Sequence, residues 1–179
     1  MSARGIPAPR SRLAAGRTRA IPDWVVTLAA VVLLNALGGL SALVGDPPPQ
    51  NAWYQTLVLP PAQPPGWAFG LAWTLLYSLL GFLLARVLAA PPGPDRQRAL
   101  LLFGLQFALN LAWSPVFFAL EAIAAALLLL LALKASAIAA TLAIGRLGRR
   151  LAWAMVPYLV WLGYALVLNW RILALNPGA

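Results

Sequence analysis

The residues of this chain that could carry chemistry are few, and the most informative ones recur at helical spacing. Within the segment from Leu100 to Leu120, steps of four, three and four separate Gln106, Asn110, Trp113 and Phe117. Such steps place side chains on one face of a helix. Two interpretations fit this face. The amides hydrogen-bond between helices in an apolar medium, or they line a cavity that takes a ligand.

Two further segments repeat this pattern with aromatic side chains. Between Trp67 and Ala90, steps of four separate Phe69, Trp73, Tyr77 and Gly81. Between Leu151 and Leu173, steps of three, four and four separate Tyr158, Trp161, Ala165 and Asn169. A buried tryptophan needs an acceptor for its indole N–H. The three faces predict either aromatic core packing or a pocket for a flat, apolar ligand.

The sequence offers few residues that could carry out ordinary catalysis. The chain contains no cysteine and no histidine, so thiolate and imidazole chemistry are excluded and haem iron would find no such axial ligand. We therefore expect no metal site, no resident cofactor and no acid–base catalytic residue.

Lys134 is a charged residue within the apolar run at residues 122–144. It either extends its amine toward the membrane surface or pairs with a ligand carboxylate.

The elements that position these residues are long apolar runs. The chain is 62% hydrophobic and 9% charged, whereas soluble domains carry about 25% charged residues. Five runs stand out, at residues 24–44, 67–90, 100–120, 122–144 and 151–173. Each would span about 30 Å as a helix, the thickness of the hydrocarbon core. The sequence predicts one all-α domain over residues 23–175, a bundle of five transmembrane helices, preceded by a disordered Arg-rich tail over residues 1–22.

The arginines predict how the bundle sits in its membrane. They gather in the tail, around the second break and around the fourth break: Arg4, Arg10, Arg12, Arg17 and Arg19, then Arg86, Arg96 and Arg98, then Arg146, Arg149 and Arg150. With the N-terminus in the cytoplasm, all of these lie inside and Arg171 alone lies outside. We therefore predict a cytoplasmic N-terminus and an external C-terminus. Short basic clusters between apolar runs suit anionic lipid, so nucleic acid is not expected as a partner.

Small residues on the third run offer a contact between copies of the chain. Gly104, Ala108 and Ala112 follow one another at steps of four. Such a run lets two helices approach closely in a membrane. A homodimer through this face is a possible assembly.

Several motifs, in order along nearly the whole chain from Trp24 onward, resemble one known family. The outer loop and second run carry Trp53-Tyr54, Leu57, Pro60, Pro64-Pro65, Trp67, Trp73-Thr74-Leu75-Leu76-Tyr77 and Gly81. The third and fifth runs add Gln106, Leu109-Asn110, Trp113, Pro115, Phe117-Phe118, Pro157-Tyr158-Leu159, Trp161, Ala165 and Leu168-Asn169. Together they resemble the TspO/MBR family, that is, the translocator proteins and tryptophan-rich sensory proteins.

The resemblance implies a five-helix bundle, often dimeric, with a pocket closed by the long first loop as an outer lid. Family members bind porphyrins, in some cases cholesterol, and synthetic benzodiazepine-site ligands. The implied ligand-binding residues here are Trp53, Trp73, Tyr77, Gln106, Asn110, Trp113, Phe117, Tyr158, Trp161, Ala165, Leu168 and Asn169. Trp73 and Trp161 match the tryptophans implicated in porphyrin chemistry.

This chain departs from the family pattern in three places. On the third run, Leu101 and Leu105 stand where family dimers carry small residues, so Gly104 and Ala108 would have to form a rotated interface or the dimer is absent. Leu59 and Ala62 stand where the family's loop carries lysine and tryptophan, which alters the contacts of the lid. Trp170 and Ala174 stand where the cholesterol motif needs tyrosine and arginine, so specific cholesterol recognition is not expected.

The sequence and the resemblance together favour a multi-pass receptor or transporter for porphyrins or other flat hydrophobic ligands, with a sensory or regulatory role, in a bacterial cell membrane. The lack of histidine and cysteine favours a metal-free porphyrin over haem. One alternative is an enzyme that degrades porphyrin with light and oxygen through Trp73 and Trp161. Another is a regulator that acts through a membrane partner docked on the Arg-rich tail.

Overall fold

The computed structural model describes residues 22–46 and 50–178, and every regular element in these residues is a helix. The elements are α1 (Asp23–Leu43), α2 (Ala52–Thr56), α3 (Gly66–Ala89), α4 (Pro94–Ser114), the π-turn η1 (Pro115–Ala119), α5 (Ile123–Leu147), α6 (Arg149–Ala154) and α7 (Val156–Leu175). Five helical stretches are long and apolar enough to cross a membrane. The predicted five-span all-α fold is confirmed. The tail predicted for residues 1–22 lies outside the described residues, except for Pro22.

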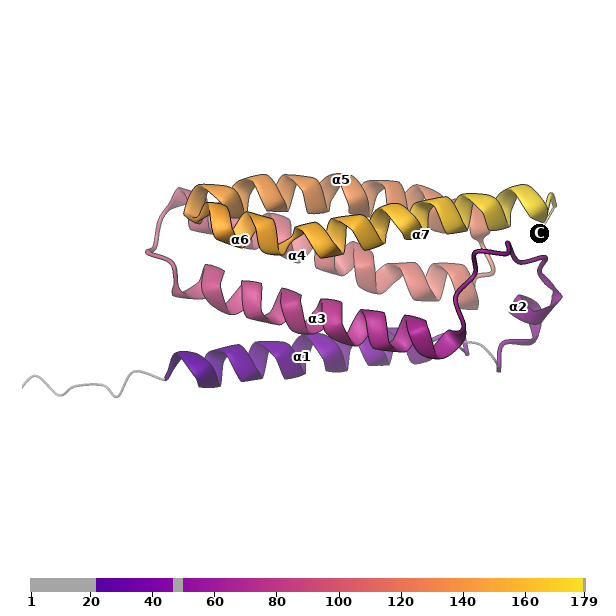
Figure 1. The fold of residues 1–179 in the computed structure, drawn as a ribbon, viewed down its shortest axis with the longest axis horizontal. Coiled ribbons are helices and arrows are strands. Elements are labelled where there is room, and N and C mark those ends of the chain that lie inside the picture. The colour runs from indigo at the N-terminus through magenta and orange to yellow at the C-terminus, as the bar shows by residue number, and fades with distance from the viewer. Residues whose placement is uncertain (1–21, 47–49, 179) are drawn as a thin grey trace, which may run out of the picture.

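The spans run alternately up and down in one bundle (Figure 1). α1 packs along α3, α4 packs along α5, and α5 also packs along α7. The start of α1, the α3–α4 connection and the α5–α6 connection lie at one end of the bundle, here called the basic end because Arg86, Arg146 and Arg149 lie near it. The loop with α2, the α4–α5 turn and the C-terminus lie at the other end, here called the loop end. A cytoplasmic basic end stays a prediction.

The outer faces of the spans are apolar, as contact with lipid requires. Leu101, Leu128 and Leu142 are each about 70% exposed or more. In water such side chains would expose a large apolar surface, whereas lipid tails are as apolar as leucine. The protein is therefore an integral, multi-pass membrane protein.

Several span boundaries differ from the hydrophobic runs, chiefly where the runs miss polar and proline-containing turns. α4 begins at Pro94, with Pro94 and Asp95 in its first turn, where a missing N–H and an acidic side chain are both favourable. The same span ends in η1, where the Leu120 N–H donates to the Pro115 carbonyl at 3.0 Å. The last span begins at Arg149 and breaks at Met155, because Pro157 has no N–H to continue α6.

The contact between α1 and α3 depends on a glycine. A Cβ atom on Gly81 would lie 2.6 Å from the Cα atom of Val31, so any side chain there would push the helices apart. Elsewhere in the same interface, the Asn35 Nδ2 atom donates to the Ser78 hydroxyl at 3.2 Å. This close packing fixes the face of α1 that turns toward the interior of the bundle.

Candidate ligand-binding cavity

A cavity of about 550 Å³ lies in the half of the bundle near the loop end. α1, α3, α4, α5, η1, α7 and the loop that contains α2 all contribute to its walls. Ligand pockets typically enclose about 300–1,000 Å³ and are mostly apolar with a few polar groups. The size and walls of this central cavity meet both conditions.

One side of the central cavity is an aromatic cluster between α3 and α7. Trp73 stacks on Tyr77 with ring centroids 5.2 Å apart, and its ring meets the edge of Trp161 at 6.2 Å. Phe69 contacts Trp161 in the same edge-on manner at 5.9 Å. These residues share the α3 and α7 faces that the spacing predicted. The rings pack on one another and also line the cavity, so aromatic packing is confirmed, while a ligand pocket stays a prediction.

A second aromatic pair, from α4 and η1, also lines the cavity. Trp113 stacks on Phe117 with centroids 5.1 Å apart. The Trp113 indole N–H donates to the Asn169 Oδ1 atom at 3.2 Å, and the Asn169 Nδ2 atom donates to the Ile123 carbonyl at 3.1 Å. Asn169 therefore lines the cavity while it fixes the orientation of Trp113.

A chain of polar side chains runs from the cavity wall into the core. The Tyr77 hydroxyl donates to the Asn110 Oδ1 atom at 2.7 Å, and the Asn110 Nδ2 atom donates to the Tyr158 oxygen at 3.1 Å. The Tyr158 hydroxyl in turn donates to the Gln106 Oε1 atom at 2.7 Å. Asn110 thus forms hydrogen bonds between helices and also lines the cavity. Gln106 and Tyr158 are fully buried, do not line the cavity and only form hydrogen bonds between helices.

Two buried N–H groups near this network have no hydrogen-bond partner among the described residues, the Nε2 of Gln106 and the Nε1 of Trp161. Unpaired buried donors are uncommon, and a site for a ligand or an ordered water is one explanation for them. Only Trp161 lines the cavity, so its indole N–H is the donor left for a bound molecule.

The loop between α1 and α3 covers this end of the bundle and is held by side-chain hydrogen bonds. The Asn176 side chain at the C-terminal end of α7 accepts from the Val58 N–H at 2.8 Å and donates to the Val58 carbonyl at 3.0 Å. The Tyr164 hydroxyl donates to the Ala62 carbonyl at 2.7 Å. Both contacts tie the loop to α7. The loop therefore has the placement expected of a lid.

Tyr54, rather than Trp53, is the aromatic residue through which α2 reaches the cavity. Its hydroxyl accepts a hydrogen bond from the Gln63 Nε2 atom at 2.7 Å, and burial raises the pKa of Tyr54 to about 12. Trp53 instead packs edge-on against Phe117 at 5.6 Å, outside the cavity lining. Of this pair, only Tyr54 lines the cavity, so a role of Trp53 in ligand binding stays a prediction without a cavity contact.

Lys134 lies outside the cavity lining and is partly buried among the spans. Its Nζ atom donates to the Leu159 carbonyl across the α5–α7 interface at 2.6 Å. A Cβ atom on Gly163 would lie 3.0 Å from that Nζ atom, so this glycine leaves the space that the amine occupies. The amine therefore hydrogen-bonds to a neighbouring helix, a partner that neither expectation from the sequence included.

The structure brings nine of the twelve sequence-predicted site residues to the cavity wall and leaves out Trp53, Gln106 and Tyr158. It adds lining residues that the sequence interpretation did not assign to the site, chiefly Asn35, Gly38, Gly39, Ser41, Ala42, Tyr54, Gln63 and Thr74. The α1 members share one signal. They are small or polar residues in the C-terminal half of a helix rich in leucine and valine.

The match to known proteins covers the whole membrane domain. A sequence profile of the TspO/MBR family matches residues 27–175. The chain belongs to the TspO/MBR family. The resemblance carried by the motifs is thus confirmed over all five spans of this family member.

Relatives within the TspO/MBR family come from bacteria and animals. The "Tryptophan-rich protein TspO" of Chlorobaculum tepidum is 34% identical over 154 residues, which cover 86% of this chain and 98% of that protein. The "Tryptophan-rich sensory protein" of Cereibacter sphaeroides is 33% identical over 86% of this chain and 93% of its own length. The "Translocator protein" of Bos taurus is 33% identical over 84% of this chain and 90% of its own length. These family relationships support a receptor-like role in the membrane.

Proposed function

We propose that the central cavity binds a porphyrin or another flat hydrophobic molecule, and that ligand binding there serves a sensory or regulatory role. The observation that carries this proposal is the cavity of about 550 Å³ between two aromatic clusters. Flat conjugated molecules gain both apolar burial and ring–ring contact in such a site. The names of the relatives, a sensory protein and a translocator protein, support the same class of function.

The polar groups of the cavity support recognition of a ligand with a few acceptors. The unpartnered Trp161 N–H supplies a donor at the aromatic cluster. The Tyr77–Asn110 pair supplies a polar patch on the cavity wall beside this cluster. Since the sequence holds no histidine or cysteine, a metal-free porphyrin fits these walls better than an iron porphyrin that needs such an axial ligand.

Fluorescence tests the proposal directly. Protoporphyrin added to the purified protein should quench tryptophan emission with a saturable, micromolar midpoint. Trp161→Phe removes the unpaired donor and should raise the midpoint about fivefold, the value of one neutral hydrogen bond. Trp153→Phe is the matched control, because Trp153 is 69% exposed and lies outside the cavity lining. The absence of saturable quenching at micromolar porphyrin would exclude this ligand class.

A second candidate function is breakdown of porphyrin under light and oxygen. The observation that favours it is the edge contact of Trp73 with Trp161 at 6.2 Å, inside the same cavity. Illumination of the complex in air should then yield a product with changed absorbance, and Trp73→Phe should stop its formation while porphyrin still binds. An unchanged yield of this product in the Trp73→Phe variant would refute a role of Trp73 in the breakdown.

A further inference from the structure

A second, smaller cavity lies at the basic end of the bundle, between the start of α1 and the end of α3. It encloses about 240 Å³ and is lined by Asp23, Val26, Ala85, Arg86, Leu88 and Ala89. None of these residues lines the central cavity, so a role for the smaller cavity is independent of the proposed function. We refer to this cavity as the α1–α3 groove.

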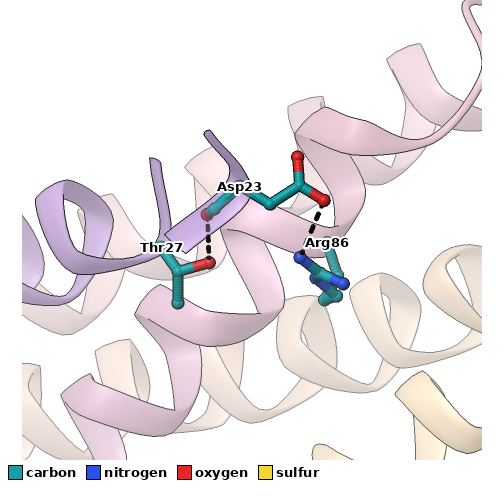
Figure 2. Close-up of polar contacts among 3 residues, drawn as sticks. All are labelled: Asp23, Thr27 and Arg86. Atoms are coloured by element: carbon teal, nitrogen blue, oxygen red, sulfur yellow. Dashed lines mark hydrogen bonds and ion pairs between the residues drawn. The ribbon is translucent and has the colours of Figure 1, made fainter. Parts of the chain in front are cut away.

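Arg86 is the cationic group of the α1–α3 groove, and its hydrogen-bonding capacity is only partly used. Its Nη2 atom lies 3.7 Å from the Asp23 Oδ2 atom (Figure 2), and its Cζ atom lies 5.7 Å from the centre of the Phe82 ring. Its Nε atom is buried and has no hydrogen-bond partner among the described residues. An arginine presents five N–H donors in a planar fork that matches carboxylate or phosphate oxygens. An acceptor from outside the chain is one explanation for a buried, unpaired Nε–H.

Asp23 does not satisfy this arginine. The Asp23 side chain is 78% exposed, and at 3.7 Å the ion pair is too long for a hydrogen bond. Such solvent-exposed pairs contribute little to stability. The neighbouring Thr27 hydroxyl donates to the Asp23 main-chain carbonyl at 2.8 Å and so does not hold the carboxylate in place. An acceptor with greater charge can therefore compete for the guanidinium.

The position of Arg86 along its span indicates which acceptor is at hand. Arg86 lies in the last turn of α3, three residues before the helix ends at Ala89. At the end of a 24-residue span, a side chain lies where the hydrocarbon core gives way to lipid headgroups. The other groove walls are mostly apolar, from Val26, Ala85 and Leu88, and suit the upper part of an acyl chain.

We propose that the α1–α3 groove binds one anionic phospholipid, whose phosphate oxygens accept hydrogen bonds from the Arg86 guanidinium and whose acyl chain lies along the apolar wall. Charge-assisted Arg–phosphate bonds are short, directional and frequently bidentate. Basic pockets between transmembrane helices are a recognised kind of site for acidic lipid headgroups. Asp23 opposes the phosphate by charge and therefore limits the affinity of the site.

The test counts lipids on the full-length protein. Delipidated protein in detergent is titrated with phosphatidylglycerol, and native mass spectrometry reports the occupancy of the first lipid. Arg86→Gln should weaken that first binding step about tenfold, in keeping with the loss of a charged hydrogen bond. Asp23→Asn should strengthen the step, and a weaker step in that variant would contradict the opposing charge.

Arg146→Gln is the matched control for charge. Arg146 also lies near the basic end and also pairs with an acidic residue, Asp95, at 3.6 Å, but it is more exposed at 59% and does not line the groove. Its substitution should change the first binding step by less than about twofold, since an exposed charge beyond hydrogen-bond reach acts only through screened attraction. Equal losses in the Arg86 and Arg146 variants would overturn the proposal, since they would show only a general attraction to a basic surface.

Further measurements separate the source of the phosphate and guard against misfolding. Inorganic phosphate at the same concentration should not displace the lipid. If it does, the site binds a free anion and the lipid proposal fails. Phosphatidylcholine should bind more weakly than phosphatidylglycerol, and equal binding would contradict the anionic preference.

If Arg86→Gln does not fold, Arg86→Lys keeps the charge without the planar fork and should still lower the occupancy. An unchanged occupancy in that variant would refute the role of the guanidinium.

Discussion

The amine of Lys134 on α5 donates a 2.6 Å hydrogen bond to the main-chain carbonyl of Leu159 on α7. The four acidic residues of the chain, Asp23, Asp46, Asp95 and Glu121, lie in loops or within a turn of a helix end, so the sequence supplies no carboxylate at the depth of Lys134. The interaction therefore compensates a charge in the membrane with a main-chain dipole.

Replacement of this lysine should leave ligand binding unchanged. Lys134→Met removes a charged hydrogen bond worth about 1.5–3 kcal/mol and also a charge that costs about 2.5–3.5 kcal/mol at mid-membrane. The two effects nearly cancel, so the thermal midpoint in detergent should stay within a few degrees of the wild type. Porphyrin quenching should keep its midpoint, because Lys134 does not line the cavity. A weakening of binding beyond about fivefold, more than 1 kcal/mol, would show that a ligand carboxylate contacts the amine.

The buried polar chain should be sensitive to the loss of one oxygen. Tyr158→Phe leaves the Asn110 Nδ2 and Gln106 Oε1 atoms without their partner in a region closed to solvent. Each unsatisfied group costs about 1–3 kcal/mol, so thermal unfolding should occur at a clearly lower temperature. Tyr164→Phe is the control, because its hydroxyl bonds the exposed loop at Ala62. Similar midpoints for the two variants would mean that the chain contributes no stability.

The attachment of the loop to the end of α7 should depend on the Asn176 side chain. Asn176→Ala removes both hydrogen bonds to the Val58 main chain. Two neutral hydrogen bonds of about 1 kcal/mol each predict an increase of at least about tenfold in local opening. Hydrogen exchange of the Val58 amide measures it. Thr56→Ala is the control, since the Thr56 hydroxyl donates to the Trp53 carbonyl within the loop and not to α7. Unchanged exchange would show that other contacts hold the loop.

The predicted dimer face is open in the structure of the single chain. A Cβ atom on Gly104 would meet nothing within 4 Å, and Ala108 on the same face is exposed. Gly104→Leu should therefore leave the fold intact and weaken any dimer by at least about tenfold, because the helices could no longer approach closely. Light scattering on the purified protein measures the mass. Ala135→Leu, on α5, is the control, and equal effects would place the contact elsewhere.

Much of this protein could be predicted from the sequence, because the bilayer imposes its own rules. A run of about 20 apolar residues in lipid has to be a helix, and steps of three and four then define its faces. The faces that carry Trp73 and Trp161 could thus be identified before any helix was placed. Polar turns at span ends, such as Pro94–Asp95, escaped detection because they carry no hydrophobic signal.

Only the tertiary structure decided what each face meets and at what depth. Asn110 and Gln106 share one face of α4, yet Asn110 reaches the cavity and Gln106 is sealed beneath it. The part of α1 in the cavity wall depends on the close contact at Gly81, and the position of the Lys134 amine depends on the gap left by Gly163. The sequence by itself determined five apolar helices and their faces, since these follow from local period and length. The cavity, the polar chain and the groove beside Arg86 arise between helices distant in sequence, where packing alone sets the distances.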